Sequence, residues 1–100
     1  MIKCYRIKHK PTGLYFKPSK GGSNLSTKGK IYPSKPSLKW AGDTIRIRIR
    51  GDEVEKLSKV KQILINYFNL KVEGQKYTWV DEYKRVPIED WEIEIYNNER

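Results

Sequence analysis

A chain of 100 residues with 37% hydrophobic and 33% charged residues is too rich in aromatic side chains for a disordered protein and too polar for a membrane protein. Its length predicts a single domain over residues 1–100, with one hydrophobic core. No stretch approaches the roughly 18 apolar residues of a membrane-spanning helix, and the start lacks a secretory signal, so we expect a cytoplasmic protein with no membrane partner.

The formal charge of +9 is concentrated in the first half of the chain. Residues 1–50 hold nine Lys and four Arg against one acidic residue, Asp43, which gives +12. Residues 51–100 hold eight basic and eleven acidic residues, which gives −3. A basic half of this kind attracts polyanions, and nucleic acid is the commonest polyanion in cells. The alternative is a lysine-rich surface that only keeps the protein in solution.

The chain has one cysteine, Cys4, and one histidine, His9. This pair excludes an internal disulfide and a Cys/His zinc site, and we expect neither a metal nor another cofactor. Cys4 lies in an alternating apolar segment, which predicts an inert buried thiol. His9 lies at a strand end before a turn, which predicts an imidazole that is solvated or bound within the turn.

The chain begins with strands and turns. Ile2–His9 alternates apolar and polar side chains, which is typical of a strand with one buried face. Pro11–Gly13 supplies a turn, because proline fixes φ and glycine accepts positive φ, and Leu14–Phe16 completes a hairpin. Residues 19–30 are almost free of apolar side chains and predict an exposed loop, and residues 31–32 predict a short strand.

The middle of the chain contains the clearest strand and the one predicted helix. Isoleucine alternates with arginine along Asp43–Arg50, so one face of the strand is buried, and Gly51 ends the strand. Asp52 then begins an amphipathic helix of about four turns that reaches Phe68, because apolar side chains recur at spacings of three and four. Glu55 follows Asp52 at the spacing of a capping box.

The end of the chain returns to strands. Residues 71–73 and 76–80 flank Gly74–Gln75 and predict a hairpin, and Glu89–Tyr96 predicts a last strand. The side chains of that strand expected to face the core are Trp91, Ile93 and Ile95. This order of elements predicts an α+β fold, in which a mostly antiparallel sheet has one amphipathic helix packed across it.

The segment from Lys8 to Lys39 is the best candidate for a binding surface, because it contains eight lysines and no acidic residue. Phosphates neutralise such charges while unpaired bases stack on aromatic rings, so a basic surface with tyrosines predicts binding of single-stranded nucleic acid. Lysine reads no base edges, so the binding is expected to be weakly sequence-specific and sensitive to salt. The predicted nucleic-acid-binding residues are Lys8, Lys10, Tyr15, Lys17, Lys20, Lys28, Lys30, Tyr32, Lys35 and Lys39. Phe16 and Trp40, in the same part of the chain, are expected in the core.

A row of arginines forms a second candidate. Arg46, Arg48 and Arg50 share one face of a predicted strand, where they would match phosphates at regular intervals. Glu92 and Glu94 alternate in the same rhythm on the last strand. If these two strands pair, the arginines and glutamates form ion pairs across the strands, and we favour this structural role. The arginines are free to bind nucleic acid if the strands are not neighbours.

No catalytic motif is present. Ser19–Asn24 is rich in glycine, yet it lacks the spacing of a P-loop, and we expect a flexible loop. Asp81–Glu82 and Glu89–Asp90 are adjacent acids, and adjacent acids at the end of a hairpin usually face solvent rather than hold a catalytic metal. We therefore expect a protein that is not an enzyme.

The opening of the chain carries a resemblance to known proteins. Residues 5–16 read YRIKHKPTGLYF and are followed by Lys17-Pro18-Ser19 and Asn24-Leu25-Ser26. Over roughly the first 40 residues, this run resembles small uncharacterised accessory proteins of tailed bacteriophages. The resemblance implies a phage product made in the cytoplasm of a bacterial host, where small basic proteins act on nucleic acid or on host machinery.

Two functions from different classes follow from the sequence. The first is a non-catalytic nucleic-acid-binding domain that uses the basic, aromatic-containing, loop-rich face between Lys8 and Lys39, with Tyr15 or Tyr32 stacking on bases. The second is a protein-interaction module that modulates a host enzyme or complex by docking the same face on an acidic protein surface. An exposed apolar patch beside the basic face favours the second function, and a groove of lysine and tyrosine favours the first.

Overall fold

The computed structural model describes residues 2–98, which form two antiparallel sheets, one α-helix and three short 3₁₀ helices. The strands are β1 (Ile2–His9), β2 (Leu14–Phe16), β3 (Leu25–Ser26), β4 (Thr44–Glu53), β5 (Tyr77–Arg85) and β6 (Trp91–Asn98). The helices are η1 (Leu38–Ala41), η2 (Val54–Lys56), α1 (Lys59–Phe68) and η3 (Ile88–Asp90). The predicted α+β fold is confirmed.

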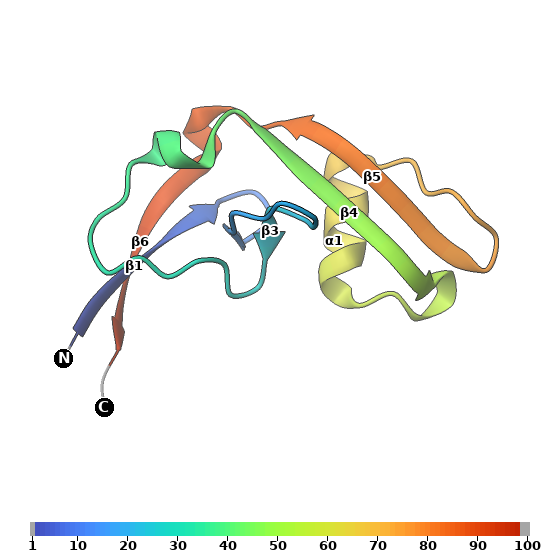
Figure 1. The fold of residues 1–100 in the computed structure, drawn as a ribbon, viewed down its shortest axis with the longest axis horizontal. Coiled ribbons are helices and arrows are strands. Elements are labelled where there is room, and N and C mark those ends of the chain that lie inside the picture. Colours follow the sequence, from blue (N-terminus) through green and yellow to red (C-terminus); the bar gives the residue numbers. More distant parts are fainter. Residues whose placement is uncertain (1, 99–100) are drawn as a thin grey trace.

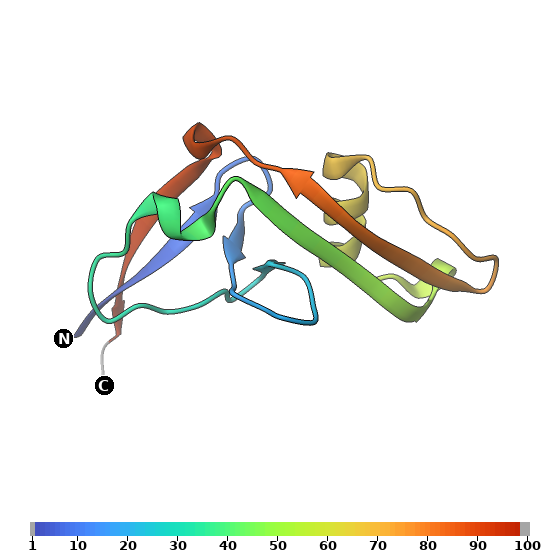
Figure 2. The ribbon, with the colours of Figure 1, turned by 45° about the horizontal axis from the view of Figure 1, so that its top comes forward.

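The two sheets lie at opposite ends of an elongated molecule of 48 × 31 × 23 Å. The four-stranded sheet has the order β3-β2-β1-β6 and lies near both termini, while β4 and β5 pair at the other end beside α1 (Figure 1). A second view shows the same arrangement, with α1 against the β4–β5 pair (Figure 2). In residues 2–98, no helix is long and apolar enough to cross a membrane.

The hairpin of β1 and β2 forms as the sequence predicts. Gly13 takes a φ of +72°, and its N–H donates to the His9 carbonyl at 2.9 Å, which closes the turn. The predicted loop 19–30 contains the two-residue strand β3, which pairs with β2. Tyr32, where a short strand is predicted, forms an isolated bridge with Tyr5 of β1.

The predicted end of the arginine strand and the predicted start of the helix are both wrong. Gly51 has a φ of +80° and lies in a bulge, so β4 continues to Glu53, which pairs with Tyr77 of β5. The helix begins only at Lys59, after an N-cap in which Ser58 Oγ accepts from the backbone of Lys61. Long-range pairing of β4 with β5 therefore overrides the local capping signal.

The core lies between the inner faces of the sheets and α1. Ile45, Ile47 and Ile49 of β4 are fully buried, as their alternation predicts, and each contributes about 2 kcal/mol of hydrophobic stabilisation. Leu64 is the buried residue of α1 and belongs to the same cluster. The helix therefore covers the isoleucine face of β4.

Three further predictions concern side chains of the four-stranded sheet and of η1 that were expected in the core. Phe16 is buried as expected, but Trp40 on η1 is 57% exposed and Ile95 on β6 is 62% exposed, so neither belongs to the core. Ile95 shares the inward face of β6 with Trp91, which is buried. The core ends between these two positions, at Ile93, which is partly buried against it.

Candidate nucleic-acid interface

The outer face of the β4–β5 pair brings together the arginine row and a row of aromatic rings. In the antiparallel register, Arg46 lies opposite Tyr83, Arg48 opposite Asp81, and Arg50 opposite Trp79. Residues directly opposite in such a pair project from the same face of the sheet. We call this surface the arginine–aromatic face. Its residues are Arg46, Arg48, Arg50, Trp79, Asp81 and Tyr83.

The alternation of the two strands explains why these side chains face solvent. The intervening residues of β4 are the buried isoleucines, and those of β5 include Thr78 and Val80, which are also buried. Trp79 is 50% exposed and Tyr83 is 67% exposed, although large rings usually contribute strongly to a core. Two exposed rings beside a row of guanidinium groups form a surface that stacking and ionic contacts can use.

Asp81 organises the charges at the centre of this face. Its carboxylate accepts two hydrogen bonds from Arg46, from Nε to Oδ1 and from Nη2 to Oδ2, each at 2.8 Å. Arg48 Nε lies 4.0 Å from Asp81 Oδ2. The hydrogen bonds from Arg46 hold the pKa of Asp81 below its ordinary value, and the charges of Arg46, Arg48 and Arg50 act in the same direction.

The guanidinium groups at the two ends of the row lie over the aromatic rings. Arg46 Cζ is 5.7 Å from the centroid of the Tyr83 ring, and Arg50 Cζ is 6.0 Å from that of Trp79. Both distances lie within the range of a cation–π interaction, which is weak at an exposed site. The two arginines therefore help to position the rings while both rings stay accessible.

A basic loop extends the face along the edge of β4 that lies away from β5. The Arg46 amide donates to Asn24 Oδ1 at 2.8 Å, and the Arg48 amide donates to Ser23 Oγ at 2.9 Å. Arg48 Nη1 also donates to the Gly21 carbonyl at 3.1 Å. These contacts tie the loop 17–24, which carries the exposed Lys17 and Lys20, to the strand with the arginines. Figure 1 shows this loop reaching from β2 to β4.

The lysines predicted to bind come from several parts of the surface. Lys17 and Lys20 lie beside the arginine–aromatic face, whereas Lys8 lies on the four-stranded sheet, with its Nζ 3.8 Å from Glu94 Oε2. The other predicted lysines are exposed elsewhere and are Lys10, Lys28, Lys30, Lys35 and Lys39. The connection from β3 to β4, which contains Lys35 and Lys39, passes round the end of the molecule that holds the termini (Figure 1).

Neither tyrosine predicted to stack on bases has a free ring. Tyr32 is only 6% exposed, and burial raises the pKa of its hydroxyl. Tyr15 is half-buried, with the Arg6 guanidinium 3.8 Å from its ring centroid and its hydroxyl donating to Glu94 at 2.9 Å. Tyr15 is thus engaged within the four-stranded sheet, and Tyr32 is buried beside β1 and Trp40.

The predicted ion pairs between the arginine row and the last strand are wrong. β6 pairs with β1 and not with β4, so Glu92 lies opposite Lys8 and Glu94 opposite Arg6. Arg6 Nη2 lies 2.6 Å from Glu94 Oε1 in that sheet. Burial raises the pKa of Glu94, but hydrogen bonds from Arg6 and Tyr15 outweigh burial and lower it overall.

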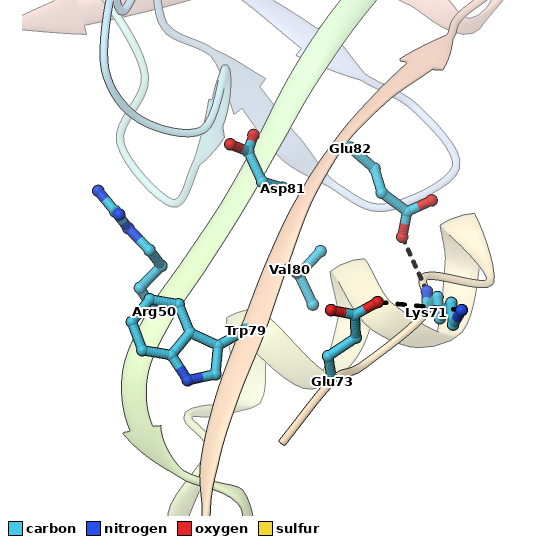
Figure 3. Close-up of a pocket in the computed structure, with 7 residues that line it drawn as sticks. All are labelled: Arg50, Lys71, Glu73, Trp79, Val80, Asp81 and Glu82. Carbon is cyan, nitrogen blue, oxygen red and sulfur yellow. Dashed lines mark hydrogen bonds and ion pairs between the residues drawn. The ribbon is translucent and has the colours of Figure 1, made fainter.

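A hollow of about 340 Å³ adjoins the arginine–aromatic face at the outer edge of β5. Arg50, Trp79 and Asp81 lie on one side of the β5 ribbon, and Glu73 and Lys71 lie on the other (Figure 3). Two further lining residues are Val80 and Glu82. Glu82, predicted with Asp81 at a hairpin end, lies within β5 and accepts a hydrogen bond from the Lys71 amide at 2.8 Å. The acids and bases of the hollow largely neutralise one another.

Trp79 and Tyr83 were not among the residues that the sequence selected. The signal for them is the stretch Tyr77–Arg85, in which aromatic side chains occupy the same alternate positions as Asp81 and Arg85. This alternation predicts that Trp79 and Tyr83 lie together on the solvent face of the strand. Assigning residues 76–80 to a short hairpin concealed this alternation.

Comparisons with known proteins add no assignment: no protein-family model, curated protein sequence or solved structure matches this chain. Within residues 2–98, no group of three or more His, Cys, Asp or Glu side chains is placed to hold a metal ion. The chemistry of the candidate site therefore has to be argued from its own residues.

Proposed function

We propose that this protein binds nucleic acid without catalysis, through the arginine–aromatic face and the adjoining loop 17–24. The observation that carries the proposal is the register of β4 and β5, which sets Arg46 and Arg50 directly opposite the exposed rings of Tyr83 and Trp79. The expected setting is a bacterial cytoplasm, where nucleic acid is an abundant polyanion.

The chemistry of the face matches both parts of a nucleic-acid strand. A guanidinium group donates two parallel hydrogen bonds to a phosphate, and an exposed ring offers its face to any base. Arg85 is a further exposed cation at an outward position of β5, so arginines outnumber the acidic Asp81 on this face. Stacking and phosphate contacts read little sequence, which predicts weakly specific, salt-dependent binding.

The test is a fluorescence-anisotropy titration of labelled single-stranded and duplex DNA and RNA. If three arginines each neutralise one phosphate of a single strand, the logarithm of affinity falls with a slope of about −2 against the logarithm of salt. Affinity then decreases roughly twentyfold between about 50 and 200 mM salt. Absence of binding at about 50 mM salt would contradict the proposal.

Two matched pairs of variants locate the binding surface. Trp79→Ala should weaken binding about 5- to 150-fold, because one stacked base is lost. Trp40→Ala changes a similarly exposed tryptophan, on η1 beside Tyr32, and should leave binding unchanged. Arg50→Ala should reduce the salt slope by about 0.7, and Lys35→Ala should not. Loss of binding in Lys28→Glu/Lys30→Glu, with Trp79→Ala unaffected, would place the site on the predicted lysine loop instead.

A protein partner is the second candidate, favoured by the free edge of β5. Trp79 pairs with Glu73 on the side away from β4, but residues 81–85 have no strand beyond them in the described part of the chain. An extended acidic segment that adds to this edge as a strand places its carboxylates beside Arg85, the outward cation of β5. Titration with a short poly-glutamate peptide, followed by amide NMR shifts at residues 81–85, tests this function.

A further inference from the structure

Among the residues of 44–50 and 77–85 whose side chains point outward, one is acidic. It lies at the centre of the arginine row. Asp81 is opposite Arg48, with Trp79 and Tyr83 two residues away on either side. Its carboxylate accepts two hydrogen bonds from the Arg46 guanidinium, each at 2.8 Å. In the free protein, Asp81 therefore occupies the place where the row would hold an anion.

A carboxylate in this geometry resembles a phosphate. Arginine binds both groups through the same two parallel N–H···O bonds, so the two anions compete for one guanidinium. The pair is open to exchange, because 46% of the Asp81 side chain and 21% of the Arg46 side chain remain exposed. Exposed ion pairs of this kind are weak and are screened by salt.

From this geometry we infer that Asp81 is an internal competitor, which a phosphate of a bound single strand displaces from Arg46. The inference rests on the proposed function and names its ligand class. Trp79 and Tyr83 are four residues apart on β5, which corresponds to roughly 14 Å along the strand. A phosphate that replaces the Asp81 carboxylate then has an aromatic ring on each side for flanking bases.

The rings decide between a single strand and a duplex. A base can stack on Trp79 or Tyr83 only if its face is free, and in a duplex the base faces are covered by neighbouring base pairs. The arginines alone would accept the backbone of either form. Asp81 lies between the two rings, so its displacement by a phosphate is coupled to stacking of bases on the rings. Single strands are therefore the preferred ligand.

The experiment compares wild type, Asp81→Asn and Glu92→Gln in titrations with a labelled oligothymidylate of about 15 nucleotides. Asp81→Asn should bind about fivefold more tightly at about 50 mM salt, because the competing ion pair is gone. Its salt slope should equal that of wild type, because Arg46 contacts a phosphate in both complexes; a slope steeper by about 0.7 would mean that Arg46 stays paired with Asp81 in the wild-type complex. Glu92→Gln removes one exposed charge from the other sheet and should change the affinity less than twofold.

The outcomes separate this inference from the proposed function. If wild type binds and Asp81→Asn binds equally or more weakly, the inference is wrong while nucleic-acid binding stands. If none of the three proteins binds, the proposed function fails and the inference fails with it. Duplex of the same length that binds as tightly as the single strand, with no effect of Trp79→Ala, would overturn the assigned ligand class.

A measurement on the wild-type protein makes the test independent of how the variant folds. Arg46 holds the pKa of the Asp81 carboxyl low in the free protein. On saturation with oligothymidylate, the carboxyl carbon of Asp81 should titrate at higher pH, because its guanidinium partner is gone and a phosphate lies nearby. An unchanged titration of Asp81 in the complex would show that the Arg46 pair persists.

Discussion

His9 makes the stability of this protein depend on pH near neutrality. Its side chain is fully buried, with ring centroids 5.4, 5.6 and 5.2 Å from those of Tyr67, Phe68 and Trp91. One ring nitrogen, Nδ1, lies 2.8 Å from Thr12 Oγ1 in the turn, whereas Nε2 is buried without a hydrogen-bond partner. The prediction of a turn-bound imidazole is confirmed, and that of a solvated one is wrong.

Burial lowers the pKa of His9 below 6.5, and the charge of Asp90, whose Oδ2 is 3.9 Å from Nε2, opposes this only in part. The unfolded chain, with an ordinary histidine, therefore binds more protons than the folded one at pH 5.5. The contribution of the neutral His9 ring to stability is therefore fully present above pH 6.5 and is lost as the pH falls below it. The free energy of unfolding decreases by up to about 1.4 kcal/mol between pH 7.5 and 5.5.

The assay is urea unfolding of wild type and His9→Gln at pH 7.5, 6.5 and 5.5. The glutamine variant is less stable overall, but its stability should not change across this range, because His9 is the one histidine of the chain. The lowered carboxyl pKa values of Asp81, Glu82 and Glu94 keep these groups ionised throughout. Wild-type stability that stays constant or rises from pH 7.5 to 5.5 would refute the reasoning.

Three further predictions concern stability. Ile47→Ala should lower the free energy of unfolding in urea by about 3 kcal/mol because it opens a cavity at a fully buried site, whereas Ile88→Ala, at an exposed site, should change it by less than about 0.5 kcal/mol. Gly29→Ala should lower the melting temperature, since φ is +66° there and a Cβ would clash with Tyr15 and lie 2.9 Å from the Phe16 carbonyl oxygen; an unchanged melting temperature would contradict this. As pH falls from about 4.5 to 3, wild type should lose more stability than Glu94→Gln, because the lowered pKa of Glu94 stabilises the folded state only while the carboxylate is charged; equal losses would be the contrary result.

The two functional hypotheses depend on different features of the same strand pair. Nucleic-acid binding requires the rings and guanidinium groups on the outer face, so Trp79→Ala weakens it. A peptide that adds to the edge of β5 uses backbone groups and ionic contacts instead, so this variant affects it less. Trp79→Ala therefore distinguishes a strand of nucleic acid from an acidic peptide.

Local patterns in the sequence determined several elements correctly. The alternation of Ile2–His9 placed β1, and that of the isoleucines placed β4 with its buried face, because side chains of a strand point to opposite sides in turn. The buried face of β1 carries Ile7 and His9, whereas Cys4, predicted to be buried, is only partly so. Pro11–Gly13 placed the first hairpin, because the turn requires its residue types. The sequence also placed the basic residues in the first half of the chain.

Only the tertiary structure decided the neighbours of the arginine row. The alternating pattern of β4 would accept either the acidic last strand or β5, and the packing of the whole core selects β5, so that Asp81 and two exposed rings replace Glu92 and Glu94. The same pairing moves the start of the helix to Lys59. Periodicity reports which face of a strand is buried, but the partner of a strand depends on contacts between residues far apart in the chain.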